Sequence, residues 1–295
     1  MVYLNVQIDI KETKKNSPVV NVFIVIAIIS IIGIPIYGYF KLKPDSIFDT
    51  DNQEQEDGTT SNEETTQEED VLEPIVITGY AEELIEIEKQ WAYILAPNPI
   101  DPNNLPILVI YNHGSNKTVE ENLDEDFKND LIEYGEALTP HNYIFAVSNA
   151  HGINWGSEDS INDNYNMYKY IKDKYGIKEK IYIIGFSMGG LPTMNFVTEY
   201  PELISKIALL APTTRSSEWD QERVDKIKDM DIKIWHGTAD VNVGYTYTKN
   251  FVDKIESLGK DIDLVTLENK THWDVDTEYI DDIFDFFNSS ETSSE

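Results

Sequence analysis

Cysteine is absent from this chain of 295 residues. Without it the chain has no disulfide, no thiolate zinc site and no lipid-modified N-terminal cysteine. Basic residues are also scarce, because 23 lysines and arginines accompany 54 aspartates and glutamates, for a formal net charge of −31. Such a surface repels nucleic acid and anionic lipid headgroups and disfavours a polyanionic substrate. We therefore predict no nucleic-acid partner.

The negative charge is unevenly distributed along the chain. Residues 1–44 carry a net charge of +3, residues 45–73 carry −12 without a single basic residue, and the remainder carries −22. The acidic stretch has almost no apolar residues, so it cannot bury a core, and its like charges keep it extended. We predict a polar tail at residues 1–18 and a flexible acidic stalk at residues 41–73.

Residues 19–40 hold no charged residue over 22 positions. As a helix this run would span about 33 Å, which is enough to cross a bilayer core of about 30 Å. A buried core helix is one alternative, and a cleaved signal peptide is another, although its apolar region would be shorter and would end at small residues. We predict an uncleaved, single-pass anchor in the lipid bilayer of the cell membrane. The lysines before it favour an N-terminus inside the cell and a following domain on the extracytoplasmic side.

From residue 74 the composition becomes that of a globular protein. Residues 74–288 suffice for one hydrophobic core, and residues 289–295 are expected to be a disordered tail. Apolar runs alternate with amphipathic stretches, which predicts an α/β fold with a mainly parallel central sheet and helices on both faces. Strands are predicted at residues 90–96, 106–111, 143–147, 181–184, 206–210, 231–235 and 261–267.

Amphipathic stripes predict the helices between these strands. Thr118 and Glu121 have the spacing of a capping box, and apolar residues recur on one helical face over residues 123–138. A helix over residues 161–175 is expected to stop at Gly176. Further helical stripes cover residues 248–258 and 279–287.

The strand predicted at residues 181–184 runs directly into a G-x-S-x-G motif, from Gly185 to Gly189. A strand before this motif and a helix after it are what a nucleophile elbow requires. The two glycines lack a Cβ, so the flanking segments can approach closely. The turn would expose the Ser187 hydroxyl and would aim the Met188 N–H, at a helix N-terminus, toward a developing oxyanion.

A serine hydroxyl becomes a good nucleophile only when a base removes its proton and a carboxylate orients that base. Asp240 follows the strand predicted at residues 231–235, and His272 follows the last predicted strand. The chain order Ser187, Asp240, His272 is the order expected after an elbow of this kind. Asp274 is a rival acid, but its position favours a helix cap.

The second oxyanion donor is expected in the turn after the strand at residues 106–111. Gly114 allows a tight turn there, and the Ser115 N–H would act together with that of Met188. His113 belongs to the same turn and is expected to be structural, and His236 is expected to brace the acid loop. Three residues are candidates for the substrate pocket: His151, Trp155 and Trp273.

Together these motifs resemble the α/β-hydrolase superfamily over about residues 90–288. The resemblance implies Ser187 as nucleophile, His272 as base, Asp240 as orienting acid, and Ser115 with Met188 as oxyanion donors. It implies no cofactor. The carboxylates do not show the spacing of a calcium loop, so no metal is expected.

Within this superfamily the chain is similar to small esterases, acylglycerol-lipase-like enzymes and serine peptidase domains. Only residues 213–230 separate two predicted strands where many members insert a lid, so we expect an open site. We predict a membrane-anchored serine hydrolase that cleaves carboxylic esters. A serine peptidase or amidase of the same fold, and a surface-displayed binding protein without turnover, stay open as alternatives, as does the oligomeric state.

Overall fold

A computed structural model describes residues 75–289 of the chain. The tail, bilayer anchor and stalk predicted within residues 1–73 lie outside the described residues, as does residue 74 at the expected domain boundary. Most of the C-terminal tail also lies outside them. Among residues 75–289, no helix is both long enough and apolar enough to cross a membrane.

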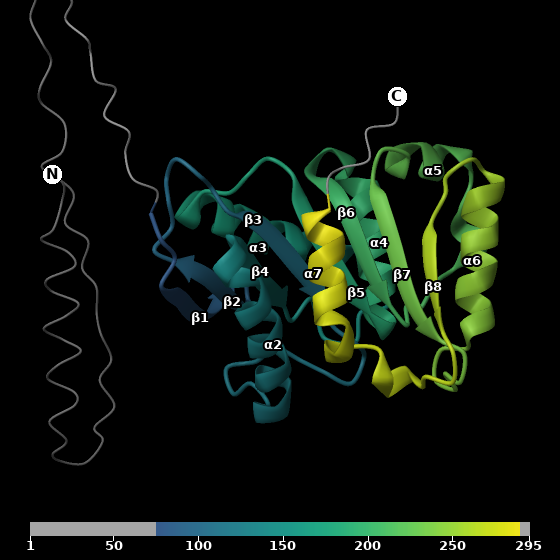
Figure 1. Ribbon diagram of the computed structural model, residues 1–295, viewed down its shortest axis with the longest axis horizontal. Helices are drawn as coiled ribbons and strands as arrows, with labels where there is room; N and C mark the ends of the chain where they lie inside the picture. Colours follow the sequence, from purple (N-terminus) through teal and green to yellow (C-terminus); the bar gives the residue numbers. More distant parts are fainter. Residues whose placement is uncertain (1–74, 290–295) are drawn as a thin grey trace, which may run out of the picture. The chain divides into compact units, whose positions relative to one another are not determined.

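Eight strands form one sheet, in the order β1-β2-β4-β3-β5-β6-β7-β8 (Figure 1). The first two strands, β1 (Gly79–Ile87) and β2 (Gln90–Asn98), pair antiparallel with each other, and β2 is antiparallel to β4. All other neighbours are parallel, which confirms the predicted mainly parallel sheet. The remaining strands are β3 (Ile107–Asn112), β4 (Tyr143–Ser148), β5 (Ile181–Phe186), β6 (Ile204–Leu210), β7 (Asp231–Gly237) and β8 (Asp263–Leu267).

Helices cover both faces of the sheet, as predicted. One apolar core lies between the sheet and α3 (Glu158–Tyr175), α4 (Gly190–Glu199), α5 (Gln221–Ile227) and α6 (Tyr245–Ser257). The second core lies between the sheet and α2 (Glu125–Leu138) and α7 (Ile280–Asn288), which cross the front of the sheet in Figure 1. Because both faces are covered, the central strands are mostly apolar, and every residue of β5 is buried.

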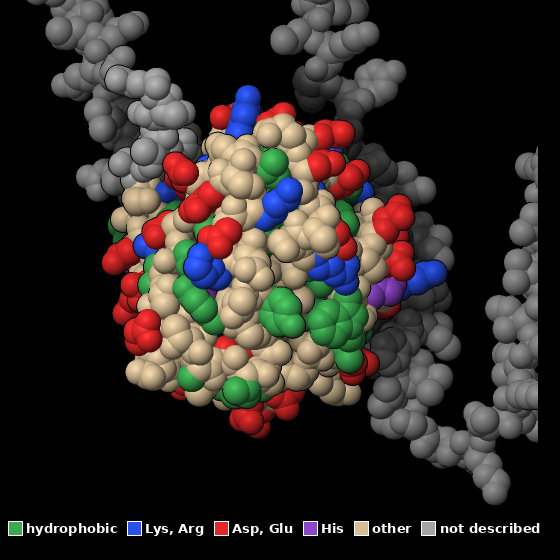
Figure 2. Space-filling model, turned by 90° about the vertical axis from the view of Figure 1, so that its right-hand side faces the viewer, with side chains coloured by type: hydrophobic (Ala, Val, Ile, Leu, Met, Phe, Trp, Pro, Cys, Tyr) green, Lys and Arg blue, Asp and Glu red, His purple; other side chains and the backbone are tan. Residues whose placement is uncertain are grey.

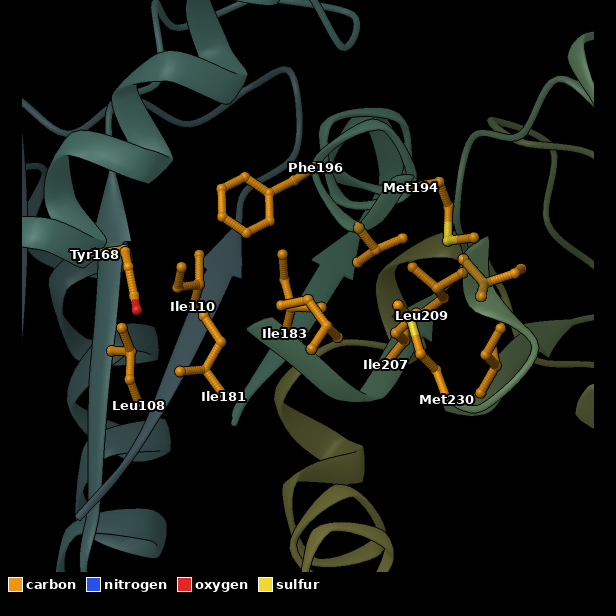
Figure 3. Close-up of a cluster of buried hydrophobic side chains, with 14 of the residues drawn as sticks. Leu108, Ile110, Tyr168, Ile181, Ile183, Met194, Phe196, Ile207, Leu209 and Met230 are labelled. Atoms are coloured by element: carbon orange, nitrogen blue, oxygen red, sulfur yellow. The ribbon is translucent and has the colours of Figure 1, made fainter. Parts of the chain in front are cut away.

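Figure 3 shows part of the first core. Ile110 of β3 and Ile183 of β5 point toward Phe196 of α4, and Leu209 of β6 lies near Met194 of the same helix. This packing seats α4, the helix that follows the nucleophile motif, directly on the strands that carry the motif and the neighbouring turn. The position of the motif is therefore fixed by the hydrophobic core itself.

Two local predictions have different outcomes. The predicted capping box of Thr118 and Glu121 is wrong, because α2 begins only at Glu125 and its first turn is capped by Asp124, whose carboxylate accepts from the Phe127 N–H at 3.0 Å. The Val119 N–H donates instead to the Asn149 side chain. The predicted stop of α3 is confirmed, since the chain leaves the helix at Gly176 with φ of +68°.

The connections after β5, β6, β7 and β8 bring the predicted site residues to one edge of the sheet. Parallel strands place their carboxyl ends together, and this edge faces the lower part of Figure 1. Between β6 and β7 there is only a short 3₁₀ helix, Ser216–Glu218, followed by α5. No lid domain covers the edge at this point, as the sequence predicted.

Candidate active site

Ser187 lies at the tip of a sharp turn between β5 and α4. Its φ is +53°, a left-handed backbone conformation that is uncommon for a residue with a Cβ. A short 3₁₀ helix, Ser187–Gly189, leads into α4, and the Ser187 carbonyl accepts from the Thr213 N–H at 2.7 Å. Such local strain persists only where the surroundings enforce it, and it concentrates at functional sites.

The glycines of the motif allow segments to pack more closely than any side chain would permit. A Cβ on Gly189 would lie 2.0 Å from the Asn112 carbonyl oxygen at the end of β3. A Cβ on Gly185 would lie 2.5 Å from Thr193 Oγ1 on α4. The turn therefore packs directly on β3, as a nucleophile elbow must.

Ser187, His272 and Asp240 form a continuous chain of hydrogen bonds. His272 Nε2 lies 2.9 Å from Ser187 Oγ, and His272 Nδ1 lies 2.7 Å from Asp240 Oδ2. His272 is 3% exposed and Asp240 is 6% exposed, so the bond between these two side chains is shielded from water, whereas the bond to Ser187 is only partly buried, at the edge of the cleft. With Nδ1–H donating to the carboxylate, Nε2 is free to accept the proton of the serine hydroxyl.

The carboxylate of Asp240 is held on both of its oxygens. Oδ1 accepts from the backbone N–H groups of Asn242 and Val243, each at 2.8 Å. Oδ2 lies 3.2 Å from Nε2 of His236, a ring that also contacts the Val243 carbonyl. Burial lowers the pKa of His236, so this ring braces the acid loop in its neutral form, as predicted.

Asp274 takes the capping position that the sequence favoured. Its carboxylate accepts from both the backbone N–H and the hydroxyl of Thr271, each at 2.8 Å. These bonds lower the pKa of Asp274 and close a capping box around the short 3₁₀ helix His272–Asp274. The rival acid therefore fixes the start of the segment that carries His272 and does not pair with its ring.

The turn after β3 is tied to its surroundings by a buried polar network. The amide of Asn112 donates to Thr193 Oγ1 at 2.9 Å and accepts from Asn164 at 2.7 Å. The ring of His113 contacts the Gly114 and Asn149 carbonyls, and burial lowers its pKa. This network fixes the Ser115 turn relative to α4, whose first turn follows Met188.

An open cleft of about 590 Å³ lies over Ser187. Trp155 and Trp273 line it, as predicted for the pocket. His151 does not line it, because the backbone turns at two successive positive-φ residues, Ala150 and His151, and the His151 ring pairs with Asp163 of α3 instead. The full lining is Ser115, Asn116, Trp155, Ser187, Thr213, Thr214, Asn242, Val243, Tyr247, His272 and Trp273.

Sequence reasoning missed part of this lining and one buried carboxylate. Thr213, Thr214 and Asn242 follow the ends of β6 and β7, and this position after a parallel strand could have identified them as cleft residues.

The buried carboxylate is that of Asp276, which accepts from the hydroxyls of Tyr134 at 2.9 Å and Tyr111 at 3.2 Å. Burial raises the pKa of Asp276 to about 7. Within residues 75–289, no cluster of three histidine or acidic side chains is arranged to hold a metal ion.

Comparison with known proteins gives the same fold. A family model of the α/β hydrolase fold matches residues 130–231. Est1E from Butyrivibrio proteoclasticus superposes with a TM-score of 0.54 at 19% identity, covering 70% of this chain and 97% of that one. The Pyrococcus horikoshii acylaminoacyl peptidase superposes with a TM-score of 0.56 at 10% identity, covering 74% of this chain and 42% of that one.

Curated relatives match over shorter segments. Dipeptidyl peptidase family member 1 of Caenorhabditis elegans is 25% identical over 126 residues, which is 36% of this chain and 15% of that protein. A homoserine O-acetyltransferase of Corynebacterium urealyticum is 26% identical over 160 residues, which is 47% of this chain and 40% of that protein. The matches thus span less than half the length of these two relatives. This protein has the α/β-hydrolase fold, as the sequence resemblance predicted, and the proteins that share this fold or match part of the sequence include esterases, peptidases and acetyltransferases.

Proposed function

We propose that this protein is a serine hydrolase that cleaves carboxylic esters through an acyl-enzyme intermediate, and that residues 19–40 hold it at a membrane. The observation that carries the proposal is the unbroken chain of hydrogen bonds from Asp240 through His272 to Ser187 Oγ. A hydroxyl aligned on a shielded imidazole, which is itself aligned on a fully hydrogen-bonded carboxylate, is the arrangement that activates serine.

The reaction follows from this geometry in two half-reactions. His272 Nε2 takes the hydroxyl proton while Ser187 Oγ attacks the ester carbonyl carbon. The negative charge moves to the carbonyl oxygen, where the Ser115 and Met188 N–H groups are the assigned donors. As the tetrahedral intermediate collapses, His272 gives its proton to the leaving alcohol, and the acyl group stays on Ser187.

Water completes the second half-reaction along the same route. His272 takes a proton from the water, the hydroxide attacks the acyl carbon, and the proton then returns to Ser187 Oγ as the carboxylic acid leaves. Asp240 stays ionised and stabilises the imidazolium that forms twice in each cycle. His236 and the two backbone N–H groups keep that carboxylate in place. No step requires a cofactor.

Two features support an ester as the substrate. The cleft is open, and the short connection between β6 and β7 holds no lid domain, which suits a small or extended acyl group. A thermostable esterase is among the solved structures that share the fold, with a TM-score of 0.54 at 19% identity. A peptide or amide is the alternative within the same mechanism, because the acyl-enzyme pathway is common to both.

The direct test is hydrolysis of p-nitrophenyl esters of graded acyl length by the full-length protein. We expect turnover that falls by a factor of about 10³ or more in Ser187→Ala and His272→Ala. A peptide panel run beside it distinguishes a peptidase from an esterase. Turnover of neither panel by the folded protein would leave the surface-displayed binding protein as the surviving alternative.

Acyl transfer to an alcohol is a second candidate, because several homoserine O-acetyltransferases match this chain. In that reaction homoserine would replace water in the second half-reaction. To distinguish the two functions, the protein is given an acetyl ester with and without L-homoserine, and the amounts of free acetate and of O-acetylhomoserine formed are compared. Acetate as the main product at millimolar homoserine supports the hydrolase, and O-acetylhomoserine as the main product supports the transferase.

A further inference from the structure

Exposed hydrophobic side chains gather around the cleft. Among the described residues, seven large hydrophobic side chains are well exposed, and five of them lie in or beside the loops that bound the cleft. The two others, Ile75 and Val76, are at the start of the described chain. On the side of the molecule shown in Figure 2, hydrophobic side chains lie mainly in the lower half, toward the edge of the sheet that carries the site. We call the five residues the apolar rim: Ile153, Trp155, Val241, Tyr247 and Trp273.

The loop that carries Trp155 is held in place by specific contacts. Trp155 has φ of +49°, an uncommon conformation for a bulky residue, and is 48% exposed. Asn154 accepts from the Gly156 N–H and donates to the Ala150 carbonyl, so it closes the loop on both sides of the tryptophan. Asn195 of α4 donates to the Gly156 carbonyl at 2.7 Å. A strained, half-exposed tryptophan that its neighbours fix over a reactive serine indicates a role in binding.

Trp273 stands beside the catalytic base. Its ring meets the His272 ring edge to face, with centroids 5.1 Å apart and an interplanar angle of 86°. Since His272 Nε2 must pass its proton to the leaving alcohol, the leaving group has to lie within hydrogen-bond reach of that nitrogen. Trp273 therefore flanks the leaving group, whereas Trp155 follows β4, on the other side of β5 from β8.

The character of the lining limits what can bind there. Within the described chain, the side chains that line the cleft are hydroxyls, amides, aromatic rings, one valine and the imidazole of His272, with no Asp, Glu, Lys or Arg among them. A charged leaving group would lose its hydration without gaining a partner of opposite charge. A flat apolar group gains contact area and favourable ring geometry against Trp273.

We propose that Trp273 forms the leaving-group subsite, and that the preferred substrates are esters of uncharged alcohols that carry an aromatic ring. This inference rests on the proposed function, because it presupposes acyl transfer to Ser187. It deepens that function by naming the alcohol half of the substrate. Trp273 is a specificity-determining residue that contacts substrate and takes no part in proton transfer.

The test compares two acetate esters with alcohols of similar acidity, 2-phenylethyl acetate and ethyl acetate. The shared acetyl group makes the second half-reaction identical, and kcat/KM reports the half-reaction in which the alcohol leaves. For the full-length protein we expect the ratio of kcat/KM values to favour the phenylethyl ester by about tenfold or more. Trp273→Ala should bring this ratio close to one, and Trp273→Phe should restore most of it.

Trp155→Ala is the matched control, because it removes a rim tryptophan of similar exposure from the other side of Ser187. It should leave the ratio within about twofold of the unmodified protein. A ratio near one in the unmodified protein, an unchanged ratio in Trp273→Ala, or equal loss in both variants would each overturn the inference. Labelling of Ser187 by a fluorophosphonate separates the two failures, since a labelled protein without the preference overturns only the subsite, whereas an unlabelled one overturns the hydrolase itself.

Discussion

His236 Nε2 lies 3.2 Å from Asp240 Oδ2, the same carboxylate oxygen that His272 Nδ1 contacts at 2.7 Å. Two imidazole rings therefore contact Oδ2 of Asp240, and its Oδ1 accepts hydrogen bonds from two backbone N–H groups. The Asp240 and His236 side chains are fully shielded from solvent and that of His272 is 3% exposed. The position of the His272 ring thus depends on a residue that does not line the cleft.

The first prediction concerns His236, a positioning residue. Replacing it with phenylalanine keeps a ring but removes the donor to Asp240. We expect kcat to fall about ten- to a hundredfold with KM nearly unchanged, because one buried hydrogen bond to a charged group is worth about 1.5–3 kcal/mol. Steady-state kinetics on the ester panel measures this split. His141→Phe is the control, since that exposed ring packs on Phe284 away from the site, and equal kinetics in both variants would contradict the assignment.

The second prediction concerns the elbow glycines. In Gly189→Ala the new methyl would lie 2.0 Å from the Asn112 carbonyl oxygen, so the elbow must separate from β3. We expect loss of ester hydrolysis together with a free energy of unfolding lowered by about 2 kcal/mol or more. Gly79→Ala is the matched control, because nothing lies within 4 Å of its added Cβ. Urea unfolding and ester turnover, measured on both variants, test whether only Gly189→Ala loses stability and activity. An active Gly189→Ala protein would refute the prediction.

The sequence could predict most of this sheet because the signals were local. A short, uncharged, β-branched run that ends at a glycine, as in β5, favours a buried strand, and a glycine beyond an amphipathic stretch favours the end of a helix, as at Gly176. β1 was missed because it is an edge strand that carries Glu82, Glu83 and Glu86, a composition that an exposed antiparallel edge tolerates. The start of α2 was misplaced because two segments, Thr118–Glu121 and Asp124, both offer capping residues and only tertiary contacts choose between them.

The candidate site was predictable where chain order alone constrains it. Ser187, Asp240 and His272 each follow a strand of the parallel sheet, and such strands deliver their ends to one edge. The sequence holds no such local signal for which side chains of a loop face the cleft. His151 and Trp155 are four residues apart, yet one turns toward Asp163 and the other toward the cleft, a choice made by positive φ angles and by Asn154.

The third prediction is a pH dependence of stability at Asp276. Burial raises the pKa of this carboxyl from 3.8 to about 7 in the folded protein. Between these two pH values the folded state binds a proton that the unfolded state has lost, so the stability that Asp276 contributes is full below about pH 4 and is lost as pH rises toward 7. Asp276→Asn keeps an acceptor for the Tyr134 and Tyr111 hydroxyls and does not titrate.

The free energy of unfolding of Asp276→Asn should therefore rise relative to that of the unmodified protein as pH increases from 4 to 7, and the difference should then level off. Urea unfolding of both proteins at half-unit pH intervals gives this difference directly. A difference that is independent of pH over this range would contradict a buried, protonated carboxyl at residue 276.

The fourth prediction concerns Lys206, a fully buried lysine on β6. Its ammonium group donates to the backbone carbonyls of Phe286, Phe287 and Ser289 at the C-terminal end of α7. Lys206→Met leaves those carbonyls without their charged donor, so we expect the free energy of unfolding to fall by about 2–4 kcal/mol. Lys180→Met is the control, because that exposed lysine contacts a single carbonyl, of Glu202, and should change stability by less than about 0.5 kcal/mol. Equal effects in the two variants would contradict a capping role for Lys206.

The central claim is that His272 activates Ser187, and covalent labelling tests it most directly. The full-length protein would be treated with a fluorophosphonate, digested and analysed by mass spectrometry, beside Ser187→Ala and His272→Ala. We predict one phosphonyl adduct on the peptide that contains Ser187, no adduct in Ser187→Ala, and labelling slowed by about a thousandfold in His272→Ala. A folded protein that is not labelled at Ser187, or that is labelled equally fast without His272, would contradict the claim.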